Sequence, residues 1–148
     1  MNDTTNPVIQ IKAYRITDIN YHQYDTKTEI DALKNNKTEE EKNGLKMKYS
    51  ISKTDDTGII EMTANLLLEE QKKMINITVN GLFKYREDIK NNEDKKKFLM
   101  INGAAMIYPY LRSTVSMVVS MDNPLTTVLP SLNFVEQFKS FNEKRQDE

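Results

Sequence analysis

The most constraining feature of this sequence is an apolar segment, residues 98–121, that shows no polar side when it is placed on a helix. Two neighbouring helical stripes are both apolar: the first holds Phe98, Ile101, Ala105, Tyr108, Val115 and Val118, and the second holds Met100, Ala104, Ile107, Leu111 and Met117. A surface helix of a monomer typically has one apolar stripe about 100° wide and a polar back. The pattern therefore predicts a helix that is covered on both sides, and we expect a second copy of the chain to supply one of the two covers.

The same segment does not predict a membrane span. Asn102, Pro109 and Arg112 interrupt the run of roughly 20 apolar residues that crossing a bilayer requires. We therefore place the helix at an interface between copies and expect no membrane insertion. The residues assigned to that interface are Ile101, Ala104, Ala105, Leu111 and Val115.

Length and charge fit a single domain, residues 1–148, with flexible ends at 1–7 and 142–148. A chain of this length buries about 68–70% of the surface that it exposes when unfolded, so a substantial core is expected. The net charge of −1 gives no attraction to nucleic acid or to an anionic membrane. The absence of cysteine and of a signal-peptide pattern at the N-terminus favours a cytoplasmic location.

No pattern of residues predicts an enzyme, a metal site or a bound cofactor. The chain has one histidine, His22, and no cysteine, so neither a histidine cluster nor a thiolate site can be assembled. Its four glycines are isolated from one another and form no phosphate-binding loop. A carboxylate-based enzyme stays open in principle, but no spacing of acidic residues recommends one.

Alternation of apolar and polar residues predicts four strands. In residues 8–21 the apolar positions change parity twice, which indicates a strand with a bulge or bend. Three further strands alternate cleanly: their apolar positions are Leu45, Met47, Tyr49 and Ile51; Ile60, Met62, Ala64, Leu66 and Leu68; and Ile75, Ile77, Val79, Phe83 and Tyr85. Turns at 54–58 and 69–72 make these three an antiparallel meander with one polar face, and Gly81 is predicted to form a bulge.

The connection between the first two strands, residues 22–43, is long and charged apart from Ile30 and Leu33. A connection of this length in a compact domain is either functional or disordered. We interpret it as a solvated charged loop.

After the sheet, Asn91 or Asn92 is expected to cap the long helix, with Glu93 and Asp94 at its positive end. Pro109 predicts a kink or break near Tyr108. Residues 122–124, DNP, end the helix, and a second helix begins near Asn133. The predicted class is α+β: a four-stranded antiparallel sheet, a long kinked helix and a C-terminal helix, with copies joined through helices and sheets.

These residues resemble a known family, the SecB export chaperones. The helix segment YPYLR (108–112) is similar to the Phe-Pro-Tyr-Ala-Arg element of that family. The segment SLNF (131–134) is similar to its Pro-Val-Asn-Phe element, and it follows at the family's own spacing, without insertion or deletion. The end of the first strand, ITDINY (16–21), and the segment NGLF (80–83) are similar to its first and fourth strands. The likeness extends over residues 8–141, and 22–43 would be the crossover loop of the family.

The resemblance implies a homotetramer built as a dimer of dimers, with its helices between two sheets. It also implies an ATP-independent holdase chaperone that binds unfolded polypeptides in apolar grooves. Our groove candidates on the sheet and helix are Leu45, Met47, Tyr49 and Tyr108, and those in and beyond the linker are Leu125, Val128, Leu129, Leu132 and Phe134. The same apolar spacings are also typical of ordinary core packing, and that alternative stays open.

SecB proteins pass their clients to the SecA motor through an acidic sheet surface, and this chain matches that surface only in part. Asp18 corresponds to one acidic position, whereas His22 and Asn76 stand at two others. Four functions therefore stay open. They are a general holdase that delivers clients to the Sec translocase, a dedicated chaperone of one partner such as an antitoxin, an oligomeric scaffold without chaperone activity, and an enzyme or small-molecule carrier that uses the apolar groove.

Overall fold

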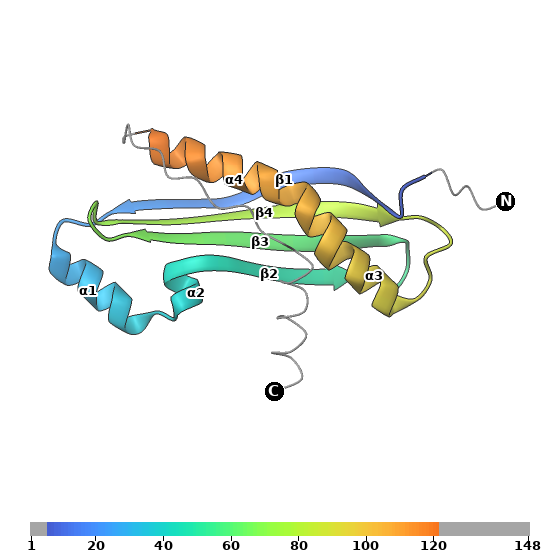
Figure 1. The fold of residues 1–148 in the computed structure, drawn as a ribbon, viewed down its shortest axis with the longest axis horizontal. Coiled ribbons are helices and arrows are strands. Elements are labelled where there is room, and N and C mark those ends of the chain that lie inside the picture. The colour runs from blue at the N-terminus through green and yellow to red at the C-terminus, as the bar shows by residue number, and fades with distance from the viewer. Residues whose placement is uncertain (1–5, 122–148) are drawn as a thin grey trace.

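A computed structural model of the protein describes residues 6–121 as one sheet and the helices that pack on it. Figure 1 shows the four long strands side by side with a helix lying diagonally over one face. The strands are β1 (Ile9–Gln23), β2 (Asn43–Ile51), β3 (Thr57–Leu68) and β4 (Lys73–Tyr85), and the helices are α1 (Lys27–Asn36), α2 (Glu39–Lys42), α3 (Asn92–Phe98), the π-helical turn η1 (Leu99–Gly103) and α4 (Ala104–Ser120). The sheet order is β1-β4-β3-β2, and all three pairings are antiparallel. The predicted α+β class with a four-stranded antiparallel sheet is confirmed.

The two faces of the sheet differ in chemistry because side chains alternate along each strand. We call the face beneath α4 the inner face and the opposite face the outer face. The inner face is completely apolar at its centre, where Ile60, Met62, Ile77, Val79 and Phe83 are fully buried. The outer face carries mainly hydroxyl, amide and charged side chains, as the alternation predicted, together with two apolar cross-strand pairs, Ile59 with Leu82 and Leu67 with Met74.

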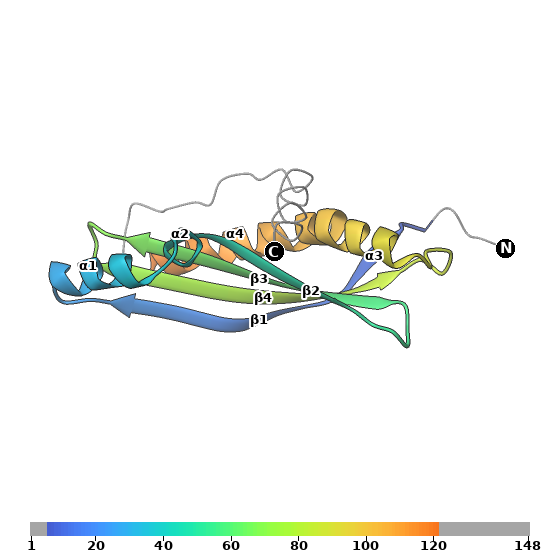
Figure 2. The ribbon, with the colours of Figure 1, turned by 90° about the horizontal axis from the view of Figure 1, so that it is seen from below.

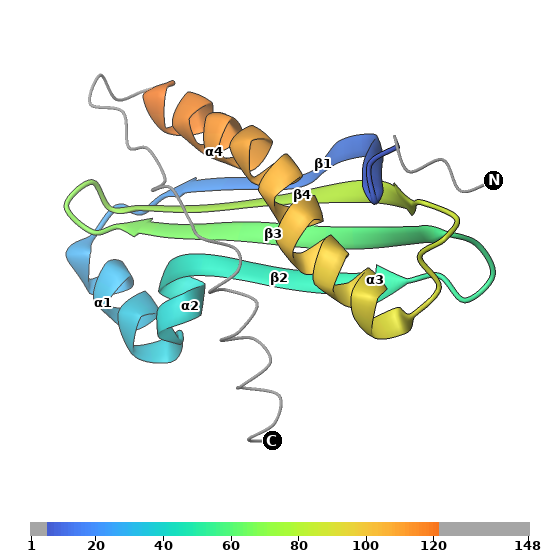
Figure 3. The ribbon, with the colours of Figure 1, turned by 45° about the vertical axis from the view of Figure 1, so that its right-hand side comes forward.

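The first strand has two irregularities, as the change of parity in residues 8–21 predicted. The register of β1 against β4 shifts between Ile11 and Ala13 and again between Ile16 and Asp18. These shifts keep Ile11, Ile16 and Ile19 opposite inner-face residues of β4. All three isoleucines nevertheless stay exposed, because β1 is an edge strand that α4 crosses only in part (Figure 3).

Gly81 does not form the predicted bulge. It pairs in regular register with Tyr14 on β1 and with Ile60 on β3. A Cβ atom at this position would lie 2.7 Å from Cγ2 of Ile107 and 2.8 Å from the Phe83 ring. Glycine is needed here because the helix passes very close to the sheet. A glycine inside a strand pattern can mark either a bulge or such a close approach, and the pattern alone does not distinguish the two.

The interpretation of 22–43 as a solvated loop was wrong, because this connection contains α1 and α2. Thr26 caps α1 by accepting a hydrogen bond from the Glu29 amide at 3.3 Å. Ile30 is only 2% exposed and packs with Leu67 and Met74 at one end of the sheet. The buried isoleucine, with Tyr24 and Leu33 packed against the same cluster, and the capping threonine order a connection that is otherwise polar.

The long helix begins as predicted: the Asn91 side chain caps α3 by accepting from the amides of Glu93 (2.8 Å) and Asp94 (3.4 Å). The helix does not break at Pro109, and α4 continues to Ser120. Pro109 itself is exposed, whereas Ile107 and Leu111 on either side of it are fully buried and hold the helix on the sheet. The irregular turn lies earlier, at η1, where Gly103 faces Ile60.

Among residues 6–121, the sheet covers only one side of this helix. Ala104, Ile107, Leu111 and Val115 lie on the buried side. The other side exposes Ala105, Pro109, Tyr110, Ser113 and Met117. Between Leu99 and Met121 the sequence has one charged residue, Arg112, so the exposed side is unusually poor in charge. The predicted ending of the helix at 122–124 and the second helix lie outside the described residues.

Candidate functional site

The sequence-predicted groove residues on β2 form a half-buried apolar stripe. Leu45, Met47, Tyr49 and Ile51 all lie on the inner face, are partly exposed, and pack against the main core. β2 is an edge strand, since it pairs with β3 and with no other strand of the described residues. The stripe therefore combines accessible apolar side chains with the unpaired main-chain groups of a strand edge.

Tyr108, the groove candidate on the helix, is a core residue rather than a surface contact. Its side chain is 6% exposed and belongs to the main apolar cluster on the inner face. Burial raises the pKa of the Tyr108 hydroxyl, and the nearby Arg112 charge opposes that shift. The spacing of apolar residues along the helix could not distinguish a core residue from a groove residue, because both kinds recur at the same helical spacing. The other groove candidates, Leu125, Val128, Leu129, Leu132 and Phe134, lie outside the described residues.

A polar pocket of about 610 Å³ opens at the C-terminal end of the β2 stripe, between the β2–β3 turn and α3. We call it the lysine pocket. Its lining comprises Tyr49, Ile51, Ser52, Lys53, Thr54, Asp55, Asp56, Lys90, Asn92, Glu93, Lys95 and Lys96. Tyr49 and Ile51 belong to both the stripe and the pocket, so the two are continuous.

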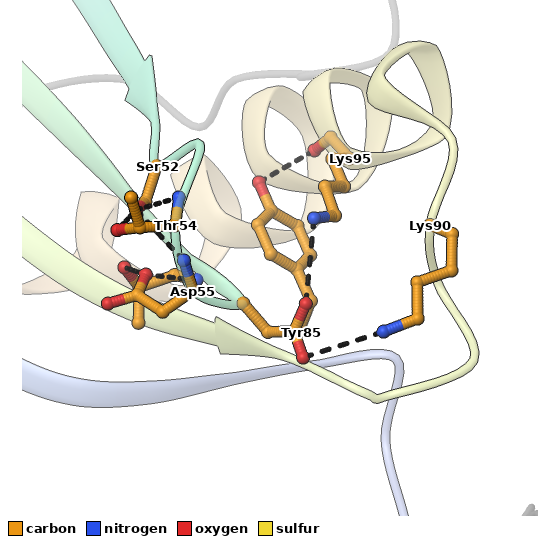
Figure 4. Close-up of polar contacts among 8 residues, drawn as sticks. Ser52, Thr54, Asp55, Tyr85, Lys90 and Lys95 are labelled. Atoms are coloured by element: carbon orange, nitrogen blue, oxygen red, sulfur yellow. Dashed lines mark hydrogen bonds and ion pairs between the residues drawn. The ribbon is translucent and has the colours of Figure 1, made fainter.

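One wall of the lysine pocket is a buried polar network, drawn in Figure 4. Lys95 is 7% exposed, and its Nζ lies 3.6 Å from Oδ1 of Asp56 and 5.5 Å from the centre of the Tyr85 ring. The Tyr85 hydroxyl donates to the Lys95 carbonyl at 2.9 Å, and burial raises the pKa of this hydroxyl. The network fastens the start of the long helix to the end of the sheet.

The opposite side of the pocket is more open. Asp56 also faces Lys90, at 3.9 Å, and the Lys96 ammonium lies 5.8 Å from the centre of the Tyr49 ring. The Asp55 carboxylate is used within the turn, where it accepts hydrogen bonds from the amide and hydroxyl of Thr57. Hydrogen bonds from Thr57 and Ser52 hold the pKa of Asp55 below its usual value. Sequence reasoning missed this pocket, although the lysine run at 95–97 was a visible signal.

Asp18, the predicted SecA-type contact, lies exposed on the outer face of β1 opposite Thr78. Its surroundings are mainly neutral: Asn20 donates to Asn76 at 3.3 Å, and Asn76 donates to Asn65 at 2.7 Å. Strand alternation and direct cross-strand pairing place Arg15, Lys46, Lys48 and Lys84 on this face, and the acidic residues Asp18 and Glu61. The outer face of the strands thus has more basic than acidic side chains.

Of the residues predicted to form the interface between copies, the structure buries three and leaves two accessible. Ala104, Leu111 and Val115 are fully buried inside the chain's own core, so they do not lie where a second copy would pack. Ala105 is exposed and Ile101 partly exposed. Helical periodicity identified the two apolar sides of the helix, but it could not show which of them packs on the sheet.

An exposed apolar surface does exist beside β1, and the sequence analysis did not identify it as such. It comprises Ile11, Ile16 and Ile19 on β1 with Tyr110, Met117 and Met121 at and after α4. The ring centres of Tyr14 and Tyr110 lie 4.8 Å apart and join the strand to the helix. The Tyr14 hydroxyl is buried here without a hydrogen-bond partner among the described residues. We call this set the β1–α4 surface.

Residues 6–121 contain no candidate metal centre and no candidate membrane-spanning helix. No group of three histidine, cysteine, aspartate or glutamate residues in this part of the chain could hold a metal ion. None of the helices there is both long and apolar enough to cross a membrane.

No protein-family model matches the chain, and no curated protein matches it by sequence. Solved structures do match it. One is the SecB-like chaperone Rv1957 of Mycobacterium tuberculosis in complex with a ChAD peptide from the Rv1956 HigA1 antitoxin, with a TM-score of 0.57, 13% identity, and coverage of 84% of this chain and 88% of that one. Another is a protein of unknown function from Streptococcus agalactiae, with a TM-score of 0.60, 10% identity, and coverage of 84% and 97%. The chain therefore has the SecB-like fold.

Proposed function

We propose that this protein is an ATP-independent holdase chaperone that binds unfolded polypeptide along the inner-face stripe of β2. The observation that carries the proposal is the stripe itself: Leu45, Met47 and Tyr49 are partly exposed on an edge strand, and the stripe is continuous with an open pocket. The SecB-like fold supports it, because a protein of that fold from Mycobacterium tuberculosis is a chaperone that binds a peptide. No catalytic role is proposed.

The chemistry of the stripe suits a client without a fixed structure. Burying apolar surface contributes about 25 cal/mol per Å² whatever the client sequence is. An extended client can also donate and accept main-chain hydrogen bonds along the free edge of β2. Met47 can adapt its shape to different client side chains. Affinity would then follow apolar content rather than one sequence.

The working form of the chaperone would be a cytoplasmic homo-oligomer, a dimer of dimers as in SecB. The β1–α4 surface supports this, because exposed Ile16, Ile19 and Met117 would gain a cover from a second copy. We keep Ala105 and Ile101 in the proposed interface and no longer assign Ala104, Leu111 and Val115 to it.

A second candidate function is that of a dedicated chaperone for one partner, such as an antitoxin. The outer face favours it over delivery to SecA, since Asp18 and Glu61 are outnumbered there by Arg15, Lys46, Lys48 and Lys84. If SecA binds at all, we expect weak binding that falls further with Asp18→Lys. A scaffold without chaperone activity is the third candidate, and it would leave the β2 stripe unused.

Suppression of aggregation tests the proposal. The intact protein should keep several unrelated unfolded proteins soluble at near-stoichiometric amounts, and a dedicated chaperone should do so for one client only. The double variant Leu45→Ser, Met47→Ser should lose this activity, because both changes remove apolar contacts from the stripe. The matched control is Lys46→Ser, Lys48→Ser, which alters the outer side of the same strand. Full activity in a folded Leu45→Ser, Met47→Ser variant would exclude the stripe as the client site.

A further inference from the structure

We infer that this chaperone binds its clients as an added strand on β2 and selects segments whose apolar side chains occur at every second position. The inference rests on the proposed function and deepens it, because it adds a preference for pattern to the preference for apolar content. The favoured client class is a segment with the period-two alternation of a β-strand. Segments of equal apolar content but helical spacing form the less favoured class.

The main-chain hydrogen bonds at the β2–β3 turn show which β2 residues point toward β3. The Ser52 amide donates to the Thr57 carbonyl at 3.0 Å, so these two residues form a hydrogen-bonded pair. In an antiparallel ladder, hydrogen-bonded pairs alternate with pairs that make no hydrogen bond. The register of β2 on β3 has no shift along the whole strand. The even-numbered residues of β2 therefore bond to β3, and the main-chain groups of its odd-numbered residues point to the free edge.

Two further hydrogen bonds agree with this alternation. The Tyr85 amide donates to the Asp56 carbonyl at 2.7 Å, which places the even-numbered residues of β3 in bonds to β4. Those residues lie opposite the odd-numbered residues of β2, so the two sets do not bond to each other. The amide of Asn43, the first residue of β2, donates to the Glu39 carbonyl of α2 and not to β3.

The same odd-numbered residues carry the apolar stripe. Leu45, Met47 and Ile51 have their side chains on the inner face and their main-chain groups at the free edge. Among residues 6–121, none of these three makes a main-chain hydrogen bond outside the sheet. A client residue directly opposite one of them lies with its side chain on the same inner face. The client residues in between lie on the outer side, beside Lys46 and Lys48, where contact with water favours polar side chains.

β2 is also the more regular of the two sheet edges. The register of β1 shifts at two places, whereas that of β2 has no shift over its nine residues. Bulges are one way in which proteins protect a strand edge from pairing. The edge open to a client runs from Leu45 to Ile51, because α2 precedes it and the β2–β3 turn follows it. A client segment of about seven residues, apolar at both ends, matches this length.

Peptides of identical composition test the preference. Each has a core of four leucines and four serines between the same charged flanks. In one peptide leucine and serine alternate, and in the other the leucines occupy the first, fourth, fifth and eighth positions, the spacing of a helix face. When extended, the second peptide brings only two leucines to one face. The full-length protein should therefore bind the alternating peptide about tenfold more tightly, as expected for two lost apolar contacts, and fluorescence anisotropy measures both affinities.

Methylation of the client's amides tests strand addition directly, because a methyl group removes the hydrogen-bond donor. In an added strand every second amide faces β2 and the others face away from it. N-methylation of one alternate set of core residues should therefore weaken binding at least about tenfold, and N-methylation of the other set should change it little. Sensitive leucine amides would mean a client antiparallel to β2, and sensitive serine amides a parallel one. Equal effects of both sets, or no effect of either, would overturn the inference.

Two variants at one β2 position give the matching test on the protein. Met47→Ala shortens the side chain and keeps the amide at the free edge. Met47→Pro also removes this amide, which the β2–β3 ladder does not use, and proline is tolerated at such an edge position. With folding checked by circular dichroism, Met47→Pro should bind the alternating peptide about three- to tenfold more weakly than Met47→Ala. Equal affinity of the two folded variants would show that the edge amide takes no part in binding.

Failure of this inference is distinguishable from failure of the proposed function. Equal binding of the two peptides by the wild type would overturn the pattern preference and leave a chaperone that selects by apolar content alone. Tighter binding of the peptide with helical spacing would overturn it as well, in favour of a client bound as a helix. Binding of neither peptide would show that no client occupies this edge, and the proposed function would fail together with the inference.

Discussion

On β4, Ile77 lies fully buried beneath α4, whereas its neighbours Asn76 and Thr78 face the opposite side of the same sheet. The inner face is held by close apolar packing, and the outer face by ladders of side-chain hydrogen bonds. Figure 2 shows the reason for the difference: the long helix covers one face along most of its length and leaves the other uncovered at the centre. The comparison indicates that stability comes mainly from the inner face, and that the outer face is free to vary in charge.

Replacing an inner-face residue should have the largest effect. Ile77→Ala removes a fully buried side chain from the centre of the core, and we expect the free energy of unfolding to fall by about 2–5 kcal/mol. Urea unfolding followed by circular dichroism measures it. A loss below about 1 kcal/mol would contradict the assignment of the inner face as the main core.

Adding a methyl group where the helix touches the sheet should also be costly. Gly81→Ala places a Cβ 2.7 Å from Ile107, so the helix or the Phe83 ring must move, and overpacking of this kind costs about 1–3 kcal/mol. The same unfolding experiment checks it. An unchanged or raised stability would show that the helix does not approach the sheet so closely. In an Ile107→Ala background, which removes the side chain that the new Cβ meets, Gly81→Ala should cost less than it does in the wild type.

The outer face should respond less. Thr78→Val removes the 2.8 Å hydrogen bond between the hydroxyl groups of Thr63 and Thr78 at almost constant volume, so the expected loss is about 0.5–1.5 kcal/mol. Asn76→Ala, measured in parallel, should fall in the same range. If either change matched the loss from Ile77→Ala, the two faces would contribute equally and the comparison would be wrong.

A similarly small effect at neutral pH is expected for Tyr85→Phe, which removes the hydrogen bond to the Lys95 carbonyl at a cost of about 1 kcal/mol. Its pH dependence is more informative. Burial raises the pKa of Tyr85 above its ordinary value of 10.0, so the folded state favours the neutral phenol. That stabilisation is present below pH 10.0 and is lost as the pH rises above it. Stability should therefore fall less steeply in alkali for Tyr85→Phe than for the wild type, and parallel curves would place the phenol outside the core.

Much of the fold followed from local patterns in the sequence. Period-two alternation gave β2, β3 and β4 with their correct inner faces, and the parity changes in residues 8–21 gave the bulges in β1. The Asn91 cap was also visible, because its side chain acts within three residues of its own position. These features depend on neighbours in the chain, which is the information that a sequence carries most directly.

The features that were missed depend on contacts between distant segments. α1 is ordered by Ile30 packing on Leu67 and Met74, which no local pattern in 22–43 reveals. The placement of Tyr108, Leu111 and Val115 in the chain's own core required knowing which side of the helix meets the sheet. The lysine pocket joins residues from the β2–β3 turn and from α3, about 40 positions apart in the sequence.

The central claim is that unfolded clients bind the inner face of β2, and site-specific photo-crosslinking tests it most directly. A photoreactive side chain would be placed in turn at Met47, on the inner face, and at Lys48, on the outer face of the same strand. With a radiolabelled unfolded client, we expect strong crosslinks from position 47 and few from position 48, at the same oligomeric state. Equal crosslinking from both positions, or crosslinking from position 48 alone, would contradict the account.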